Sequence, residues 1–394
     1  MPLNILIAPD KFKGSLTAQA AAEAIAVGWR RARPQDTLVL LPIADGGDGF
    51  GAILGQLLGA QPRRVATVDA AQRPREGVFW WEAQTRTAVI ESAQVIGLAQ
   101  LPAGRYHPFE LDTFGLGALL RGAGRLGARR CLVGVGGSAT NDAGFGLARA
   151  LGWRFFNRLD REIVRWTELH GLGLLQPPAS LPAFEDLAVA VDVRNPLLGS
   201  RGCTRIFGPQ KGLGPDDFEF AERCLQRLAD VVARGAGNAL HLEPGSGAAG
   251  GLAFGLRCFA GARVESGFDL FARCARLTER LGAADLVVTG EGSLDEASLM
   301  GKGVGELAVR CQAQGRPCVA VAGCVRIGPA GQGFADVQAL TPDLTTPECA
   351  MGEGPAWVAA AAERLGRRLD AAGRLGRWER VRPGGVEKLP GETC

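Results

Sequence analysis

The chain has 394 residues, of which 46% are hydrophobic and 22% are charged, the composition of an ordinary globular protein with about two domains. Its net charge of +3 is too small to indicate nucleic acid or an anionic membrane as the main partner. No apolar run approaches the roughly 18 residues of a membrane-spanning helix, and the first residues do not resemble a signal peptide. We therefore expect a cytoplasmic protein that acts on small molecules. The sequence leaves open whether it forms a homo-oligomer.

The N-terminal segment predicts a strand, a loop and a helix. An apolar strand over 4–8 leads into a loop that carries Lys11 and Lys13, and a helix with one apolar face follows from about 18 to 33. Open parallel sheets bind ligands at the carboxyl ends of their strands. The loop is therefore a candidate binding loop, although an ordinary solvated loop would also fit these residues.

The same pattern repeats in the next segment. A strand over 38–43 ends in a glycine-rich turn that contains Asp45 and Asp48, and a second helix follows. The glycines alone could make a tight turn. The two carboxylates are harder to explain, because neighbouring carboxylates repel one another unless a cation or a donor lies between them.

Shorter strands are predicted from about residue 65 onwards. The segments 65–69, 77–82 and 87–91 have the apolar patterns of strands, two of them in a hairpin or meander. This change from strand–helix units to short consecutive strands suggests that a second domain begins there. The polar, proline-rich segment 160–182 is predicted to be a surface excursion.

The segment 131–153 predicts a ligand site at a strand-to-helix turn. A buried strand ends at Gly136 and Gly137, which allow a sharp turn, and the helix that follows begins at about residue 145. Between them lie four polar residues, at a point where unpaired backbone N–H groups favour an anion: Ser138, Thr140, Asn141 and Asp142. A dinucleotide fingerprint also matches formally here, but the polar side chains and the carboxylate would crowd a pyrophosphate, so we disfavour a dehydrogenase.

Another apolar strand, over 187–193, contains Asp192 near its carboxyl end. Acids are rarely buried unless they are paired or bind metal. We therefore expect Asp192 to be buried and functional, with a structural role in capping a nearby loop as the alternative. The loop 207–212 contributes one cation, Lys211.

The remaining segments repeat the combination of glycine and polar residues. The glycine cluster 245–252 fits a tightly packed helix and a phosphate cradle equally well. A strand over 285–288 ends in a loop with Gly290, Glu291 and Asp295. Strands over 317–322 and 337–340 and a helix over 355–377 complete the pattern, and the aperiodic tail 382–394 is predicted to be disordered.

Together these loops favour phosphoryl transfer. Lysines and glycine-rich backbone can hold phosphates, carboxylates can hold magnesium, and one carboxylate can orient an acceptor hydroxyl. No G-x-x-x-x-G-K-[ST] motif and no protein-kinase signature occurs, so the two large kinase classes are excluded. The sequence has no G-x-S-x-G motif and no Cys–His pair that would indicate hydrolysis through an activated nucleophile.

Seven blocks of sequence, in order along the chain, resemble the type-1 family of bacterial glycerate kinases: 8–18, 42–49, 134–152, 191–199, 207–212, 245–252 and 289–295. The resemblance implies ATP-dependent phosphorylation of D-glycerate with Mg²⁺, usually at the 2-hydroxyl to give 2-phosphoglycerate, while the sequence leaves open whether the 2- or the 3-hydroxyl is the acceptor. It also implies two α/β domains with the active site between them. One is a flavodoxin-like parallel-sheet domain, residues 1–64 plus 285–381, and the other is an inserted restriction-endonuclease-like domain, residues 65–284.

Roles for the candidate residues follow as hypotheses. Asp192 is the base or orienting carboxylate, and Lys11 and Asp45 complete the catalytic set. The residues expected to bind substrate or phosphate are Lys13, Gly136, Gly137, Ser138, Thr140, Asn141, Asp142, Lys211, Gly290 and Glu291. Asp48 and Asp295 are the candidate metal ligands, although magnesium and ribose contacts cannot be ranked among the acids by chemistry alone.

Three positions depart from the family pattern. Arg194 replaces a common acid beside Asp192, and Ser293 and Ala297 stand where the family often has arginine and glutamine. If that arginine binds a phosphate or the substrate carboxylate, affinity or substrate choice will differ. A non-catalytic binding protein on the same scaffold is the alternative, but the candidate acids are present and disfavour it.

Overall fold

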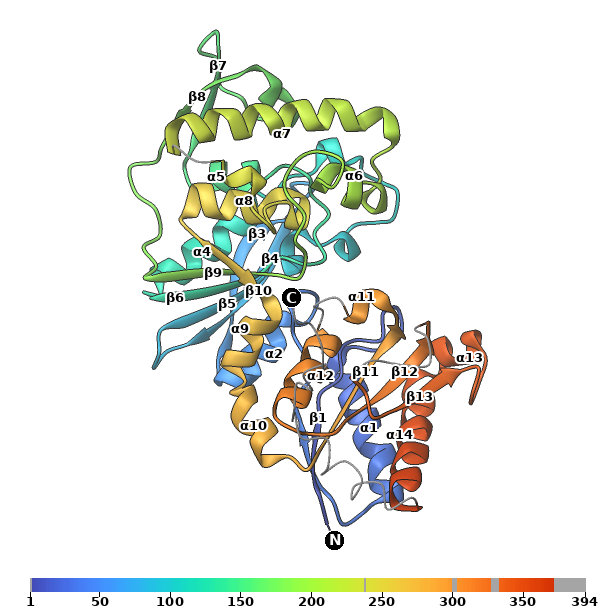
Figure 1. Ribbon diagram of the computed structural model, residues 1–394. Coiled ribbons are helices and arrows are strands. Elements are labelled where there is room, and N and C mark those ends of the chain that lie inside the picture. Colours follow the sequence, from blue (N-terminus) through green and yellow to red (C-terminus); the bar gives the residue numbers. More distant parts are fainter. Residues whose placement is uncertain (1, 237–238, 300–302, 327–332, 372–394) are drawn as a thin grey trace, which may run out of the picture. The chain divides into compact units, whose positions relative to one another are not determined.

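The computed structural model describes residues 2–236, 239–299, 303–326 and 333–371, and the predicted disordered tail 382–394 lies outside this range (Figure 1). Contacts divide the chain into two compact units, which we call unit 1 (Met1–Ile43 and Arg276–Cys394) and unit 2 (Ala44–Ala275). Unit 2 is thus inserted into unit 1 along the sequence.

The described part of unit 1 contains five strands, β1 Asn4–Ile7, β2 Thr37–Leu40, β11 Leu286–Leu294, β12 Cys318–Val325 and β13 Asp336–Thr341. Its helices are α1 Ala18–Ala32, α10 Leu277–Ala283, α11 Glu296–Leu299, α12 Gly303–Ala313, α13 Pro347–Gly352 and α14 Gly354–Ala371.

The strands of unit 2 are β3 Gln61–Val68, β4 Pro74–Glu82, β5 Thr87–Glu91, β6 Arg130–Gly134, β7 Arg154–Asn157, β8 Leu172–Gln176, β9 Asp186–Val191 and β10 Arg263–Ser266. Its α-helices are α2 Phe50–Leu58, α3 Ala93–Ile96, α4 Leu116–Arg125, α5 Phe145–Ala150, α6 Cys203–Phe207, α7 Pro215–Ala236, α8 Ala248–Ala260 and α9 Gly267–Cys274. Short 3₁₀ turns lie at Leu98–Gln100, Pro108–Glu110, Trp166–Gly171, Pro209–Lys211 and Leu240–Leu242.

The predicted domain boundaries, after residues 64 and 284, both lie further along the chain than the division between the units. Helix α2 packs on strands β4 and β5 of unit 2. Gly51 and Gly55 let it approach, since a Cβ on them would lie 1.9 and 2.4 Å from Trp80. Residues 44–64 therefore belong with the second sheet, whereas α10 contacts β1 of unit 1.

The sheet of unit 1 has five parallel strands in the order β13-β12-β11-β1-β2. Helices α1 and α14 lie side by side against it (Figure 1). Ile5, Ile7 and Val288 belong to the core that these two helices share, while Leu6 and Val287 are buried outside that core. Alternate residues of a strand face opposite sides of a sheet, so both faces of this sheet are covered, as in α/β proteins built on parallel strands.

The main sheet of unit 2 is mixed and has six strands in the order β10-β9-β6-β5-β4-β3. Strands β3, β4 and β5 form the antiparallel meander that the sequence predicts. Strands β5, β6, β9 and β10 are parallel. Their carboxyl ends therefore lie on one edge of the sheet, which we call the carboxyl edge of unit 2.

A second core of unit 2 includes residues from the segment predicted to be a surface excursion. Trp166, Leu169 and Leu172 are almost completely buried against helices α7 and α8. The prediction for 160–182 is wrong in this part, because Trp166 and Leu169 of the short turn Trp166–Gly171, and Leu172 directly after it, belong to the core that α7 covers. The polar residues between them occupy the exposed side.

Among the described residues, no helix is long and apolar enough to cross a membrane.

Candidate active site

The glycine turn after β6 contacts the turn that contains Asp45 and Asp48. The N–H of Gly136 donates to the carbonyl of Gly46 at 2.9 Å. A Cβ on Gly136 would lie 2.6 Å from Gly47, and one on Gly137, whose φ is +75°, would lie 2.5 Å from Oδ1 of Asp48. These two positions require glycine, and the structure brings the two predicted loops together at the carboxyl edge of unit 2.

Glu91, a buried acid that was not predicted to belong to the site, holds the turn that contains Asp45 and Asp48. Its carboxylate accepts hydrogen bonds from the N–H groups of Gly49 (3.2 Å) and Gly51 (3.0 Å), at the start of α2. An acid is favoured at a helix N-terminus. Burial raises the pKa of Glu91, and the charge of Asp48 adds to this shift. The signal in the sequence was an acid that directly ends the apolar strand β5.

Asp142 is fully buried and its carboxylate is already engaged by the protein. Oδ2 accepts from the N–H and hydroxyl of Thr113, at 2.9 and 2.8 Å, and from the N–H of Gly146 at 2.9 Å. Oδ1 accepts from the N–H of Gly144 at 3.2 Å. Burial raises the pKa of Asp142, and these hydrogen bonds act against that shift. The geometry therefore fits a residue that fixes the start of α5 rather than one that contacts substrate.

A second acid, Asp112, lies close enough to Asp142 for their charges to interact. Burial, and then the charge of Asp142, raise the pKa of Asp112 to about 6. Its Oδ1 accepts from Nε2 of Gln72 at 2.6 Å and from the N–H of Phe114 at 2.9 Å.

We expect Asp112→Asn to stabilise unit 2 above neutral pH. The asparagine carbonyl can accept the same two hydrogen bonds, while the repulsion from Asp142 disappears. A folded-state pKa raised from 3.8 to about 6 means that the wild-type protein loses stability as pH rises through this window. Unfolding by urea should give the variant an advantage of about 3 kcal/mol at pH 8, shrinking to almost nothing near pH 4. An advantage that is independent of pH would contradict the assignment.

The other polar residues of the turn, Ser138, Thr140 and Asn141, are also buried and bonded within the unit. The hydroxyls of Ser138 and Thr140 lie 2.9 Å apart, and the N–H of Thr140 donates to Ser138 Oγ at 3.1 Å. Asn141 donates from Nδ2 to Thr204 of helix α6 at 3.0 Å. The half-buried Gly136 and the exposed Gly137 are therefore the parts of this loop that a ligand can reach.

Lys211 is also buried, with 7% of its surface exposed. Its Nζ donates to the carbonyl of Thr140 at 2.6 Å. Burial lowers the pKa of Lys211 to about 8, against the attraction of Cys203 and Asp142. The prediction that Lys211 reaches the nucleotide finds no support in the direction of this side chain.

Asp192 is exposed, so the prediction that it is buried is wrong. Strand β9 ends at Val191, two residues before the predicted end at Val193, and Asp192 begins the following loop. The correction leaves Asp192 at the carboxyl edge of unit 2, where a ligand can meet it.

The glycine cluster 245–252 is explained by close packing. Ala249, Gly250 and Gly251 all have left-handed backbone angles at the start of α8. A Cβ on Gly250 would lie 2.0 Å from the carbonyl oxygen of Thr140, and the carbonyl of Gly250 accepts from the N–H of Ala143 at 3.0 Å. Of the two interpretations left open, the tightly packed helix is the one these contacts fit.

Unit 1 brings its own predicted residues together. In the loop after β1, Phe12 is buried, Lys11 is half-buried and Lys13 is exposed. The loop lies against β11, since a Cβ on Gly292 would lie 3.1 Å from the backbone nitrogen of Lys13. The backbone of Asp10 is anchored by a hydrogen bond from its N–H to the carbonyl of Gly290 at 2.8 Å. The two lysines thus lie beside Gly290 and Glu291, which are part of strand β11 and not, as predicted, of a loop after it.

Asp295 follows β11 and caps the short helix α11. Its Oδ1 accepts from the N–H of Ser298 at 3.2 Å, and its N–H donates to the Ser298 hydroxyl at 3.1 Å. Neither Asp295 nor Asp48 is part of a larger acidic group, because the residues that the structure describes contain no cluster of three or more His, Cys, Asp or Glu able to hold a metal. Mg²⁺ in kinases is usually held by one or two carboxylates together with phosphate oxygens, so single acids remain compatible with it.

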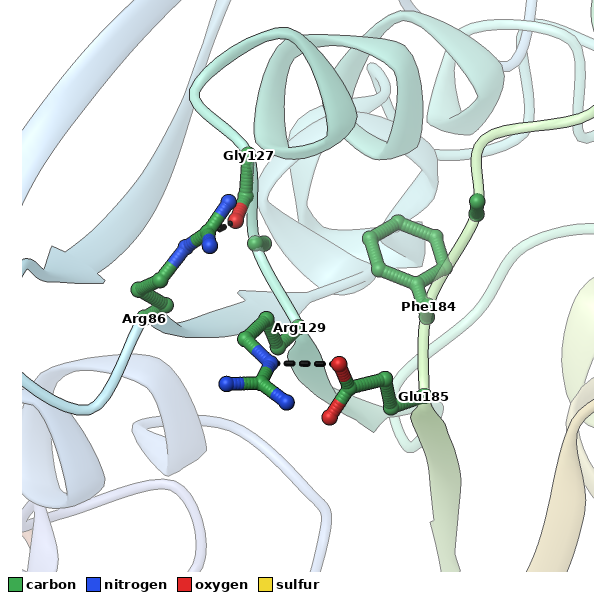
Figure 2. A pocket seen from close by; sticks show the side chains of 7 residues that line it. Arg86, Gly127, Arg129, Phe184 and Glu185 are labelled. Carbon is green, nitrogen blue, oxygen red and sulfur yellow. Dashed lines mark hydrogen bonds and ion pairs between the residues drawn. The ribbon is translucent and has the colours of Figure 1, made fainter.

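A pocket of about 370 Å³ lies at the opposite edge of the unit 2 sheet (Figure 2). It is lined by residues that precede β5, β6 and β9, including Arg86, Arg129 and Glu185. Both arginines have partners in the protein, the carbonyl of Gly127 and the carboxylate of Glu185. This pocket is therefore separate from the loops of the carboxyl edge.

Comparison with known proteins identifies the family. A sequence profile described as the glycerate kinase family matches residues 5–370. The Escherichia coli protein named glycerate 2-kinase is 35% identical over 333 residues, which cover 82% of this chain and 85% of that protein. A glycerate kinase of Haemophilus influenzae is 34% identical over 332 residues, which cover 82% and 86%.

A solved structure agrees with this assignment. A crystal structure from Salmonella typhimurium, described provisionally as glycerate kinase 2, has a TM-score of 0.79 and 30% sequence identity, and the match covers 95% of this chain and all of that one. The protein is an ATP-dependent small-molecule kinase. The chain belongs to the glycerate kinase family, so the predicted family and the predicted activity on glycerate are confirmed.

Proposed function

We propose that this protein transfers the γ-phosphoryl group of ATP to the 2-hydroxyl of D-glycerate. The observation that carries the proposal is the gathering of the loops after β5, β6 and β9 at the carboxyl edge of unit 2. There, the exposed Asp192 and the accessible Gly136–Gly137 turn lie at the ends of two adjacent parallel strands. The name of the Escherichia coli relative, glycerate 2-kinase, supports the choice of hydroxyl.

Asp192 would accept the hydrogen bond of the acceptor hydroxyl and take its proton as the new P–O bond forms. A carboxylate in this position orients the attacking oxygen and accepts its proton. Its exposure is an advantage for this role, because substrate and solvent must both reach it. Arg194, also exposed, lies two residues further along.

The lysines and glycines would hold the negative groups. Lys11 and Lys13 can neutralise a phosphate or the glycerate carboxylate, and Asp45 completes the catalytic set proposed with them. The backbone at Gly136 and Gly137 allows the close approach that a small substrate needs. Bound Mg²⁺ would neutralise charge on the phosphates, and Asp48 in unit 2 and Asp295 in unit 1 are each candidates to hold it together with phosphate oxygens.

The role of Asp192 is tested with Asp192→Asn. The amide keeps the size of the side chain but cannot take a proton, so kcat with saturating D-glycerate and ATP should fall at least 100-fold, with little change in thermal stability. Asp160→Asn, at an exposed turn of the same unit, is the control and should behave as wild type. Turnover of Asp192→Asn within about tenfold of wild type would exclude Asp192 as the base.

The finer fold assignments are also proposals. Numbered within unit 1 alone, the strand order is 2-1-3-4-5, which is the order of flavodoxin-like sheets. It supports the flavodoxin-like assignment for unit 1. The restriction-endonuclease-like assignment of unit 2, the cytoplasmic location and any homo-oligomer stay predictions.

A further inference from the structure

Two consecutive residues of the loop after β6 are held by one short segment of unit 2. Thr204, at the start of this segment, accepts the Nδ2 hydrogen bond of Asn141 at 3.0 Å. Lys211, seven residues later, donates from Nζ to the Thr140 carbonyl at 2.6 Å. We call residues 203–211 the clamp segment. Its contacts reach the loop just after Gly136 and Gly137, the part that a ligand can meet.

The local sequence explains why Lys211 points inward. Pro209 begins a 3₁₀ turn and Gly212, with φ +107°, ends it. The N–H of Lys211 donates to the carbonyl of Gly208 at 2.9 Å, which fixes the backbone of the turn. A Cβ on Gly208 would lie 2.1 Å from the Thr204 carbonyl oxygen, so the turn packs directly on α6. The exposed Gln210 lies next to Lys211 in the same turn.

Burying an ammonium group is costly unless it makes strong hydrogen bonds. The hydrogen bond of the Lys211 ammonium to a backbone carbonyl of the candidate active-site loop offsets part of this cost. That carbonyl is confined on another side by Gly250, whose Cβ, if present, would lie 2.0 Å from it. The Thr140 peptide is therefore confined by Lys211 and Gly250.

We propose that Lys211 is a positioning residue for phosphoryl transfer, which fixes the Gly136–Asp142 loop through the Thr140 carbonyl and does not itself contact ATP. The inference rests on the proposed function for its effect on turnover, but its effect on the loop is independent of it. A lysine that bound nucleotide would direct its ammonium group to the ligand. The ammonium group of Lys211 is instead hydrogen-bonded inside unit 2.

The charge of Lys211 makes the clamp sensitive to alkaline pH. Burial lowers the pKa of Lys211 to about 8, and the charged and titratable groups that face it are Cys203 on α6 and Asp142 in the loop. Glu222 on α7 acts on the same Cys203. A neutral amine donates a weaker hydrogen bond than an ammonium. The loop should therefore loosen as pH rises through about 8.

The experiment compares wild type, Lys211→Met and the matched control Gln210→Met. Hydrogen–deuterium exchange of peptides spanning 138–144 should be at least tenfold faster in Lys211→Met and unchanged in Gln210→Met. With D-glycerate and ATP, kcat of Lys211→Met should fall about 100-fold, while KM for ATP stays within twofold. A large rise in KM for ATP with unchanged exchange would overturn the proposal and restore the nucleotide contact.

Wild-type protein alone provides a second measurement, which does not depend on the folding of a variant. After correction for intrinsic exchange, exchange of the same peptides should accelerate between pH 7 and 9, and no such change should occur in peptides of β12. Constant protection across this range would contradict the proposal. If the loop loosens as expected but the protein does not phosphorylate glycerate, the inference that Lys211 holds the loop would stand and the proposed function would be rejected.

Discussion

Replacing Asp142 with asparagine is expected to lower the free energy of unfolding of unit 2 by about 4 kcal/mol. The side chain is fully buried and accepts four hydrogen bonds, three of them at Oδ2. Asparagine has the same shape, but its NH₂ group must then face an N–H donor of Thr113, Gly144 or Gly146. A buried donor left facing another donor loses its partner and repels its neighbour.

Thermal unfolding followed by circular dichroism measures this effect, and the transition of unit 2 should fall by roughly 10 °C. Asp112→Asn serves as the matched control, since it makes the same chemical change at the neighbouring acid and is expected to stabilise at pH 8. If both variants lost stability equally, the distinction drawn between the two buried acids would be wrong.

Replacing Gly250 with alanine is the second change with a large expected effect. Its φ of +68° is unfavourable for a side chain, and the new Cβ would lie 2.0 Å from the Thr140 carbonyl oxygen and 2.8 Å from Cα of Asn141. The backbone strain costs about 1 kcal/mol, and relieving the clash costs about 2 kcal/mol more. The relief must displace the loop that carries Gly136 and Gly137, so kcat should fall on the order of 100-fold.

The control separates backbone strain from the clash. Gly261 ends the same helix, has φ +72°, and would meet nothing within 4 Å if it carried a Cβ. Gly261→Ala should therefore cost only about 1 kcal/mol and leave kcat unchanged. Urea unfolding and steady-state kinetics on both variants measure the two effects. Equal losses of kcat in the two variants would show that packing at Thr140 is irrelevant to turnover.

Much of the fold follows from the sequence because the strands of parallel sheets are short apolar runs. Strand β5 begins and ends where the pattern predicts, and α1 begins at Ala18 as expected. Ala221, Cys224, Leu225 and Leu228 recur at helical spacing in α7 and are buried in the second core of unit 2. Because the spacing of apolar residues follows from which face is buried, elements with one buried face can be predicted from the sequence.

The boundary between the units was not readable in the same way. Helix α2 looks like the continuation of the first βα pattern, and nothing in its own residues says which sheet covers it. The deciding contacts are those of Gly51 and Gly55 with Trp80, a residue about 25 positions further along the chain. Long-range packing of this kind has no local signal.

The sequence predicted where the candidate site residues lie better than it predicted what each of them does. The loops named from the sequence do gather within each unit, but polarity was taken to mean contact with substrate. In the loop after β6 most polar side chains bind the protein itself, and Asp192, expected to be buried, is exposed. The partners Glu91, Thr113 and Thr204 were missed, since their roles depend on residues at least 29 positions away.

The most direct test of the central claim is ³¹P NMR of the purified protein incubated with ATP, Mg²⁺ and D-glycerate. The proposed function predicts loss of the γ-phosphate signal of ATP only when D-glycerate is present, and growth of the signal of 2-phosphoglycerate. A 3-phosphoglycerate signal would contradict the choice of hydroxyl. ATP that remains unchanged, although it binds the protein, would contradict the kinase activity itself and favour a non-catalytic binding protein.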